Sequence, residues 1–188
     1  MLHVMMLALL AQPPAARERP IAKTPDACAL LADADVRDAL RAVVKQRQPG
    51  SQEAHGLLLS QCYVGTGSPR SVSIAVAGVT TSGGRTVTPR AVWRDQFHPR
   101  GERAAERNRE HREAARPGEA RETEGEADVR PIAGVGEEAF WSGTRVAGAL
   151  YVLRRNTFLR VSVGGISDEK ERIEKSRQLA LRALAKLP

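Results

Sequence analysis

The chain is poor in aromatic residues, cysteine and long apolar runs, and each shortage excludes a class of protein. Phe, Trp and Tyr make up 4% of the 188 residues, so Val, Leu, Ile and Ala must fill any core. Beyond the first residues, no apolar run approaches the roughly 20 residues that cross a bilayer, so we expect no membrane span in the mature protein. Two cysteines without paired histidines cannot complete a tetrahedral zinc site.

The histidines and glycines form no pattern that is typical of a catalytic, metal or cofactor site. His55, His98 and His111 lack the spacing of metal ligands, and no serine lies in a nucleophile-elbow pattern. Gly134 and Gly136 lack the third glycine and the Lys-Ser/Thr pair of phosphate-binding loops, so we interpret them as a structural turn. We therefore predict no catalytic, metal-binding or cofactor-binding residues.

Glu137 and Glu138 are adjacent acids of the kind that serve as general acid and general base. In an extended segment, adjacent side chains point to opposite faces, so the two carboxyl groups are poorly placed to act together. We interpret both as exposed loop residues. The protein is accordingly predicted not to be an enzyme.

The first residues of the chain resemble an export signal. Residues 2–11 read LHVMMLALLA, which is the length of a signal-peptide apolar region and about half a membrane span. We predict a signal peptide at residues 1–16, a flexible lead-in at 17–23, and a periplasmic or secreted protein. The Lys or Arg that usually precedes the apolar run is missing, so an apolar tail on a cytoplasmic protein is the alternative.

Arginine dominates the charge of this chain, whose formal net charge is +7. Guanidinium groups bind phosphate and carboxylate, so an anionic partner is one interpretation. The arginines are scattered and often stand beside Glu or Asp, so we favour the coding bias of a GC-rich genome. Nucleic acid is therefore an unlikely partner.

Charged residues are densest at about 94–128, where Phe97 is the only large apolar side chain. We predict a charged helical or disordered insert there.

The remaining pattern predicts one α+β domain over residues 24–188. Helices are expected from Thr24 to Leu31 and from Asp33 to Val44, a loop from Lys45 to Glu53, and a last helix that Ser167 caps. Alternating apolar residues predict the strands, with the clearest at 61–66, 71–76, 150–153 and 158–163. Short strands joined by turns favour a mainly antiparallel sheet, with the N- and C-terminal helices packed on one face.

Two further predictions concern particular side chains. Cys28 on the first helix and Cys62 on the first strand are expected to form a disulfide, because an even cysteine count follows an export signal. Two buried free thiols are the alternative. The aromatic residues of the C-terminal half are a possible ligand groove, although packing into the core or sheet edge is the favoured interpretation. These residues are Phe140, Trp141, Tyr151 and Phe158.

Three motifs resemble a known group of proteins. Residues 28–36 read CALLADADV, Cys62 precedes Tyr63, and residues 134–141 read GVGEEAFW. In these motifs the chain resembles a family of small bacterial secreted or lipoprotein envelope domains of unknown function. The resemblance implies a place in the bacterial envelope and supplies no catalytic residues. The chain departs from the family by lacking a lipid-attachment cysteine and by carrying the charged insert.

Small size, an export signal and the absence of converging reactive groups predict a non-catalytic binding or interaction domain of the bacterial envelope. Its partner would be an unknown protein or envelope ligand. Two alternatives stay open at this point. One is a polyanion-binding protein that uses surface arginines, and the other is an envelope hydrolase with an unrecognised site.

Overall fold

The computed structural model describes residues 24–82, 84–99 and 128–187. The predicted signal peptide and lead-in lie outside the described residues, as does most of the predicted insert. The description below concerns the remaining chain.

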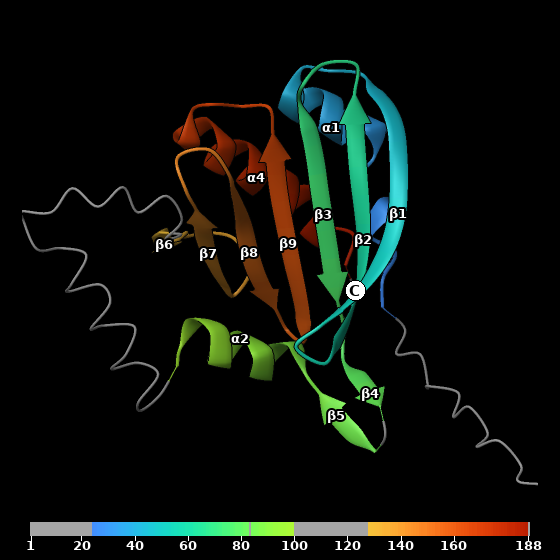
Figure 1. Ribbon diagram of the computed structural model, residues 1–188, viewed down its shortest axis with the longest axis vertical. Helices are drawn as coiled ribbons and strands as arrows, with labels where there is room; N and C mark the ends of the chain where they lie inside the picture. Colours follow the sequence, from blue (N-terminus) through green and yellow to red (C-terminus); the bar gives the residue numbers. More distant parts are fainter. Residues whose placement is uncertain (1–23, 83, 100–127, 188) are drawn as a thin grey trace, which may run out of the picture.

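A seven-stranded sheet in the order β1-β2-β3-β9-β8-β7-β6 forms the centre of the fold, and each pair of neighbours is antiparallel (Figure 1). Its first three strands and its last four each run as a meander, and the two meanders meet where β3 pairs with β9. A separate hairpin joins β4 to β5. The strands are β1 (Val44–Ala54), β2 (Leu57–Thr66), β3 (Ser71–Ala77), β4 (Thr80–Ser82), β5 (Arg85–Val87), β6 (Asp128–Pro131), β7 (Glu138–Gly143), β8 (Gly148–Arg154) and β9 (Thr157–Gly164).

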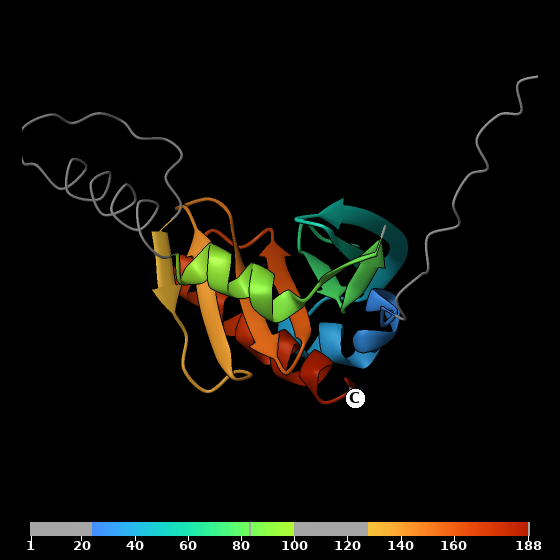
Figure 2. The same ribbon diagram turned by 90° about the horizontal axis from the view of Figure 1, so that it is seen from below.

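Helices lie on both sides of this sheet (Figure 2). The 3-10 helix η1 (Ala27–Leu30) packs on one face with α1 (Asp33–Leu40) and α4 (Glu169–Leu184), and we call this the inner face. The shorter α2 (Pro89–Phe97) packs on the opposite, outer face against β8 and β9. The predicted α+β class, with an antiparallel sheet and terminal helices on one face, is confirmed.

The main core fills the space between the inner face and the helices η1, α1 and α4. Period-two alternation along the strands places one set of apolar side chains there, and helical spacing in α4 supplies the opposing set. Central members of this core are Val64, Val72, Ile74, Val76, Leu159, Val161, Leu179 and Leu184.

A buried arginine ties α4 to the turn between β7 and β8. The Arg172 side chain is 1% exposed, and its guanidinium donates hydrogen bonds to four backbone carbonyl oxygens over 2.8–3.0 Å. Two of these carbonyls precede α4, and the other two belong to Thr144 and Arg145. Removing the guanidinium charge from water is costly, and the hydrogen bonds to four carbonyl oxygens offset that cost.

Local expectations differ from the structure at several points. The helix predicted from Asp33 to Val44 ends at Leu40, because Arg41 takes a left-handed conformation and Val44 already belongs to β1. The loop predicted at 45–53 is wrong, because these residues form most of β1. Helix α2 contains Arg94–Phe97, so the first described residues of the predicted insert are helical. Asp168, rather than Ser167, caps α4, because its carboxylate accepts a hydrogen bond from the Glu171 amide at 2.7 Å.

Candidate functional site

The outer face of the sheet is divided into an apolar half and a polar half. The apolar half lies under α2 and contains Leu59, Ala77, Leu153 and Phe158. Trp93 of α2 is 1% exposed and packs against Phe158, with the two ring centroids 5.9 Å apart. In Figure 1, α2 crosses only the lower end of the sheet, and no other described helix covers this face above it.

Glu137 and Glu138 fasten α2 to the sheet. The Glu137 carboxylate accepts a hydrogen bond from Arg90 of α2 and another from the Arg155 amide at 2.7 Å. Glu138 Oε2 lies 2.8 Å from Trp93 Nε1, which donates to it, and 2.7 Å from His98 Nε2.

These contacts also set the ionisation of the two acids. Hydrogen bonds from Arg90 and from the Arg155 amide lower the pKa of Glu137. Those with His98 and Trp93 lower the pKa of Glu138. Both carboxyl groups are thus held in the ionised form, and their partners lie on α2 and at the β8–β9 turn.

The four aromatic residues of the predicted groove do not come together as one set. Phe140, Tyr151 and Phe158 lie on the outer face, where Phe97 of α2 stacks on Phe140 with centroids 4.7 Å apart. Trp141 lies on the inner face, is 0% exposed, and donates a hydrogen bond to Glu169 at 3.0 Å. Phe140 and Trp141, which are adjacent in β7, therefore lie on opposite faces of the sheet.

The polar half of the outer face is the candidate site, and we call it the open face. The strand pairing lines up Gln48 of β1, Tyr63 of β2, Ser73 of β3 and Ser162 of β9 in one row across the sheet. Neighbouring rows add further amide, hydroxyl and glycine positions. The open face comprises Gln46, Gln48, Gly50, Gln52, Gln61, Tyr63, Gly65, Ser71, Ser73, Ser142, Arg160 and Ser162.

Arg160 is the only charged residue among those that define the open face. Its guanidinium carbon lies 5.8 Å from the centre of the Tyr151 ring, and its Nε donates a hydrogen bond to the Tyr151 hydroxyl at 3.4 Å. The ring therefore already attracts the single positive charge at the border with the apolar half. The rest of the open face is electrically neutral.

Several polar groups of the open face have no hydrogen-bond partner within the described residues. The side chains of Gln48, Tyr63 and Ser73 make no such bond there, and Tyr63 is 39% exposed. By contrast, Gln61 donates to Gln52 at 2.7 Å, and Ser162 donates to the Gly148 carbonyl at 2.7 Å. The central row thus offers free donors and acceptors to a ligand.

Gly50 leaves an open space on β1, the edge strand of this surface. A Cβ atom added to Gly50 would meet no other atom within 4 Å, and the residue pairs with Gln61 of β2. The contrast is Gly65, where the Gln46 side chain already lies 2.8 Å from the position of an added Cβ. Glycine within a strand often marks the place where a ligand approaches closely.

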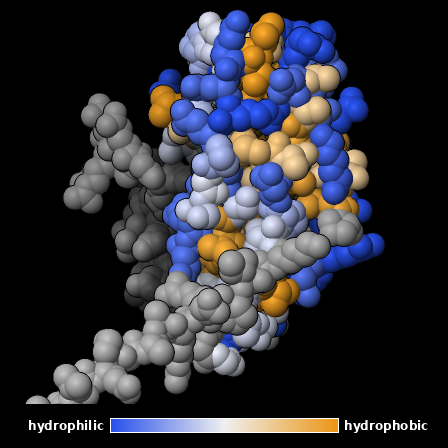
Figure 3. Space-filling view, turned by 90° about the vertical axis from the view of Figure 1, so that its right-hand side faces the viewer, coloured by the Kyte–Doolittle hydropathy of each residue, from blue (hydrophilic) through white to orange (hydrophobic). Residues whose placement is uncertain are grey.

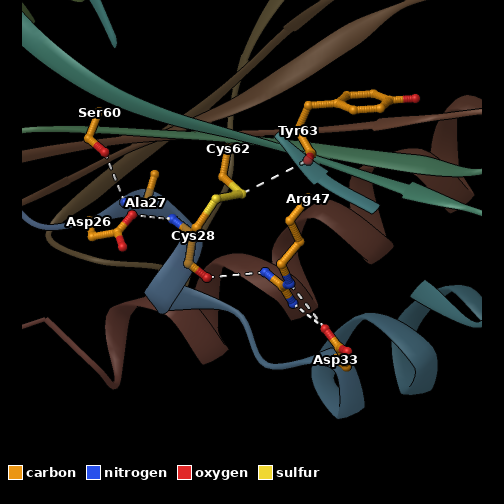
Figure 4. The surroundings of a disulfide bond; sticks show 8 residues. All are labelled: Asp26, Ala27, Cys28, Asp33, Arg47, Ser60, Cys62 and Tyr63. Atoms are coloured by element: carbon orange, nitrogen blue, oxygen red, sulfur yellow. Dashed lines mark hydrogen bonds and ion pairs between the residues drawn. A yellow bond between two sulfur atoms is a disulfide. The ribbon is translucent and has the colours of Figure 1, made fainter. Parts of the chain in front are cut away.

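The disulfide lies directly behind the open face (Figure 4). Cys28 of η1 and Cys62 of β2 are joined with a sulfur–sulfur distance of 2.00 Å, which confirms the predicted pairing. Figure 4 shows Tyr63 pointing away from the disulfide, to the other side of the sheet. Arg47 of β1 adds a second link, because it donates to the Cys28 carbonyl at 3.1 Å and forms an ion pair with Asp33 at 2.6 Å. Both strands that carry most of the open face are thereby fixed from behind.

Two further views of the surface concern the β1 edge of the sheet and the end near α2. The side of the molecule seen in Figure 3 is mainly hydrophilic, and its hydrophobic residues lie in small separate groups. A cleft of about 780 Å³ lies between the β1–β2 turn, β5 and α2, and its walls carry both acids and bases, including Glu53, His55, Arg85 and Asp95. No group of His, Cys, Asp or Glu in the described residues could hold a metal ion, this cleft included.

Comparisons with protein-family models, with curated proteins and with solved structures find no match to this chain. The resemblance to bacterial envelope domains therefore stays a prediction. Among the described residues, no helix is long and apolar enough to cross a membrane.

The sequence interpretation did not identify the open face. Gln46, Gln48 and Gln52 lie at every second position around Gly50, which is the period of a strand, but they fell in the predicted loop. This recurrence of glutamine at every second position is the sequence feature that could have predicted the strand and its polar face.

Proposed function

We propose that this protein is an exported, non-catalytic binding domain of the bacterial envelope that holds its ligand against the open face. The observation that carries the proposal is a rigidly backed sheet surface with free hydrogen-bonding groups. Gln48, Tyr63 and Ser73 face outwards without partners in the described chain, while the Cys28–Cys62 disulfide fixes the strands behind them.

Export is supported by the chemistry of the disulfide. Disulfides persist in oxidising compartments such as the periplasm and the extracellular medium, and cytosolic thiols are mostly kept reduced. The apolar start of the sequence, and motifs that resemble those of bacterial envelope domains, also favour export.

Binding is favoured over catalysis by the use that the fold makes of its adjacent acids. A general acid at neutral pH needs a raised pKa, whereas contacts with α2 lower the pKa of Glu137 and of Glu138. Both carboxylates are already occupied in fastening a helix, which supports a structural role for them.

Polyanion binding, the other alternative, finds little support on this surface. Affinity for nucleic acids or acidic polymers grows with the number of anionic groups that Lys and Arg neutralise. The open face offers Arg160 alone, and Tyr151 already contacts its guanidinium.

Export is tested by mass spectrometry of the native protein, with thiols alkylated before and after reduction. We expect the apolar start to be absent from the mature chain, and Cys28 and Cys62 to be alkylated only after reduction. A full-length chain recovered from the cytosol with both thiols reactive would contradict export.

The binding role is tested by retention of envelope extract on the immobilised, oxidised chain. The test variant carries Gln48→Glu and Ser73→Glu, which place charge on the open face. The matched control is Gln178→Glu, on α4. We expect retention of specific material to fall with the open-face variant and to stay unchanged with the control. Equal retention by all three proteins, or none by the wild type, would refute the proposal.

A further inference from the structure

We propose that the ligand of the open face is a neutral glycan. This inference rests on the proposed function, because it names the chemical class of the ligand for the same surface. The argument uses the charge, the hydrogen-bonding groups and the unfilled space of that surface.

The first observation is the near absence of charge. Charged residues make up 27% of the chain, yet the open face carries only Arg160, at its border. Anionic polymers, phosphorylated ligands and charged peptides would each leave their charges without partners there. A ligand without net charge has no charged group to remove from water without a partner, so it binds such a surface without that cost.

The second observation is the kind of polar group that faces outwards. A glutamine amide and a serine hydroxyl each donate and accept hydrogen bonds, which matches the hydroxyl groups of a sugar in both directions. Tyr63 adds an exposed aromatic ring, on which the apolar C–H face of a sugar ring can pack. Gln48 lies directly opposite Tyr63 across the β1–β2 pair, so an amide and a ring stand side by side.

The third observation is the space above Gly50. Gln48 and Gln52 flank this glycine on the same face of β1, with roughly 13 Å of strand between them. Gln61 of β2 lies opposite it. A sugar ring seated over Gly50 would have amide groups at both ends and along one side, and the missing side chain lets it approach the backbone.

An extended peptide is the competing ligand, and the geometry favours it less. Peptides that bind sheets usually add a strand to an edge, where backbone N–H and C=O groups supply the affinity. The open face itself presents side chains, so a peptide laid across it would have its own amides unmatched. The free edge of β1 borders this face, but Pro49, near the middle of β1, has no backbone N–H to donate to an added strand. Hydroxyl-rich ligands have no such backbone to satisfy.

The experiment measures binding of the oxidised full chain to a panel of oligosaccharides by titration calorimetry. The neutral probes are cellohexaose, maltohexaose, mannohexaose and chitohexaose, and the anionic probes are oligogalacturonate and dextran sulfate. The test variants are Gly50→Leu, which fills the space, and Tyr63→Ala. Leu is accepted in an exposed strand, where Gly itself is unfavourable, so Gly50→Leu should fold.

Matched controls separate the open face from the rest of the surface. An added Cβ at Gly78 also meets no atom within 4 Å, and Gly78 lies between β3 and β4, outside the open face. Gly78→Leu therefore controls for Gly50→Leu, and Gln178→Ala controls for the loss of a polar side chain elsewhere.

We expect at least one neutral probe to bind with little dependence on salt, and each test variant to weaken that binding about tenfold or more. Both controls should bind as the wild type does. Preference for the anionic probes, or neutral binding that the test variants leave unchanged, would overturn the inference. If no glycan binds but extract is still retained through the open face, the ligand class is wrong and the proposed function survives. If that retention also fails, both are wrong.

Discussion

Removal of the Cys28–Cys62 disulfide should cost a large part of the stability of this domain. The two cysteines are 34 residues apart in sequence, and the cross-link therefore restricts a long loop of the unfolded chain. The loop-entropy relation gives a loss of about 3–4 kcal/mol in the free energy of unfolding when such a link is removed. Domains of this size have a total of about 5–15 kcal/mol, so the expected fall in melting temperature is roughly 6–16 °C.

Three forms of the protein separate the cross-link from the packing of its sulfur atoms. The reduced wild type keeps both side chains but loses the covalent bond. The double variant Cys28→Ala/Cys62→Ala also empties space in the core, since Cys62 is 0% exposed. The variant Cys28→Ala/Cys62→Val refills that space. Urea unfolding, followed by circular dichroism, gives the free energy of each form.

The cross-link accounts for the loss if the reduced wild type and the valine variant both fall by about 3–4 kcal/mol. The alanine variant should fall further because of its cavity. A loss below about 1 kcal/mol in the reduced wild type would refute the loop-entropy reasoning for this fold.

Three other perturbations test how the helices are held. Trp93→Ala should cost about 3–5 kcal/mol in unfolding free energy, because it empties the apolar half under α2, and an unchanged urea midpoint would show that α2 is not docked there. The pKa of Glu138 is lower in the folded than in the unfolded protein, so its contribution to stability is complete above the ordinary value of 4.5 and is lost as pH falls through the lowered value. Urea midpoints across this range should therefore fall more steeply for the wild type than for Glu138→Gln, and identical slopes would contradict the assignment. Arg172→Met should cost about 3 kcal/mol or more, because four carbonyls lose their donor. The control is Arg177→Met, at a partly exposed arginine of the same helix, which should change the stability little.

The sequence predicted those elements in which local pattern and burial agree. Val72, Ile74 and Val76 alternate with small polar residues, and β3 indeed buries one set against the helices. The disulfide was also predictable, because the cysteine number and the predicted export signal indicate it independently of the fold. When a strand or helix buries one face, its apolar residues recur with the period of that element, and this period can be recognised in the sequence.

Strand β1 was missed because it lies at the edge of the sheet and most of its residues are exposed. Exposure on both faces removes the apolar alternation, and Pro49-Gly50 is typical of a turn. An edge strand tolerates proline because one side of its backbone has no strand to pair with. Pairing with β2, which no local pattern of β1 reveals, holds these residues extended.

Helix α2 and the division of the aromatic residues carried readable signals. Thr88 and Pro89 are a typical helix start, and the Thr88 hydroxyl accepts a hydrogen bond from the Ala91 amide at 3.2 Å. Alternation within β7 places Phe140 and Trp141 on opposite faces, so they could not share one groove. The partners that hold α2, by contrast, come from residues distant in sequence, and a single sequence gives no access to such pairs.

The single contact line between the two meanders has a consequence for the order of folding. Hairpins within each meander need only short loops, so each can form early, but β3 and β9 come together only after the whole intervening chain is enclosed. Until then, both of these apolar strands present unsatisfied edges to any other chain. A polypeptide released across a membrane at high local concentration would be most prone to aggregate in that interval, and a chaperone that shields either edge would relieve the hazard.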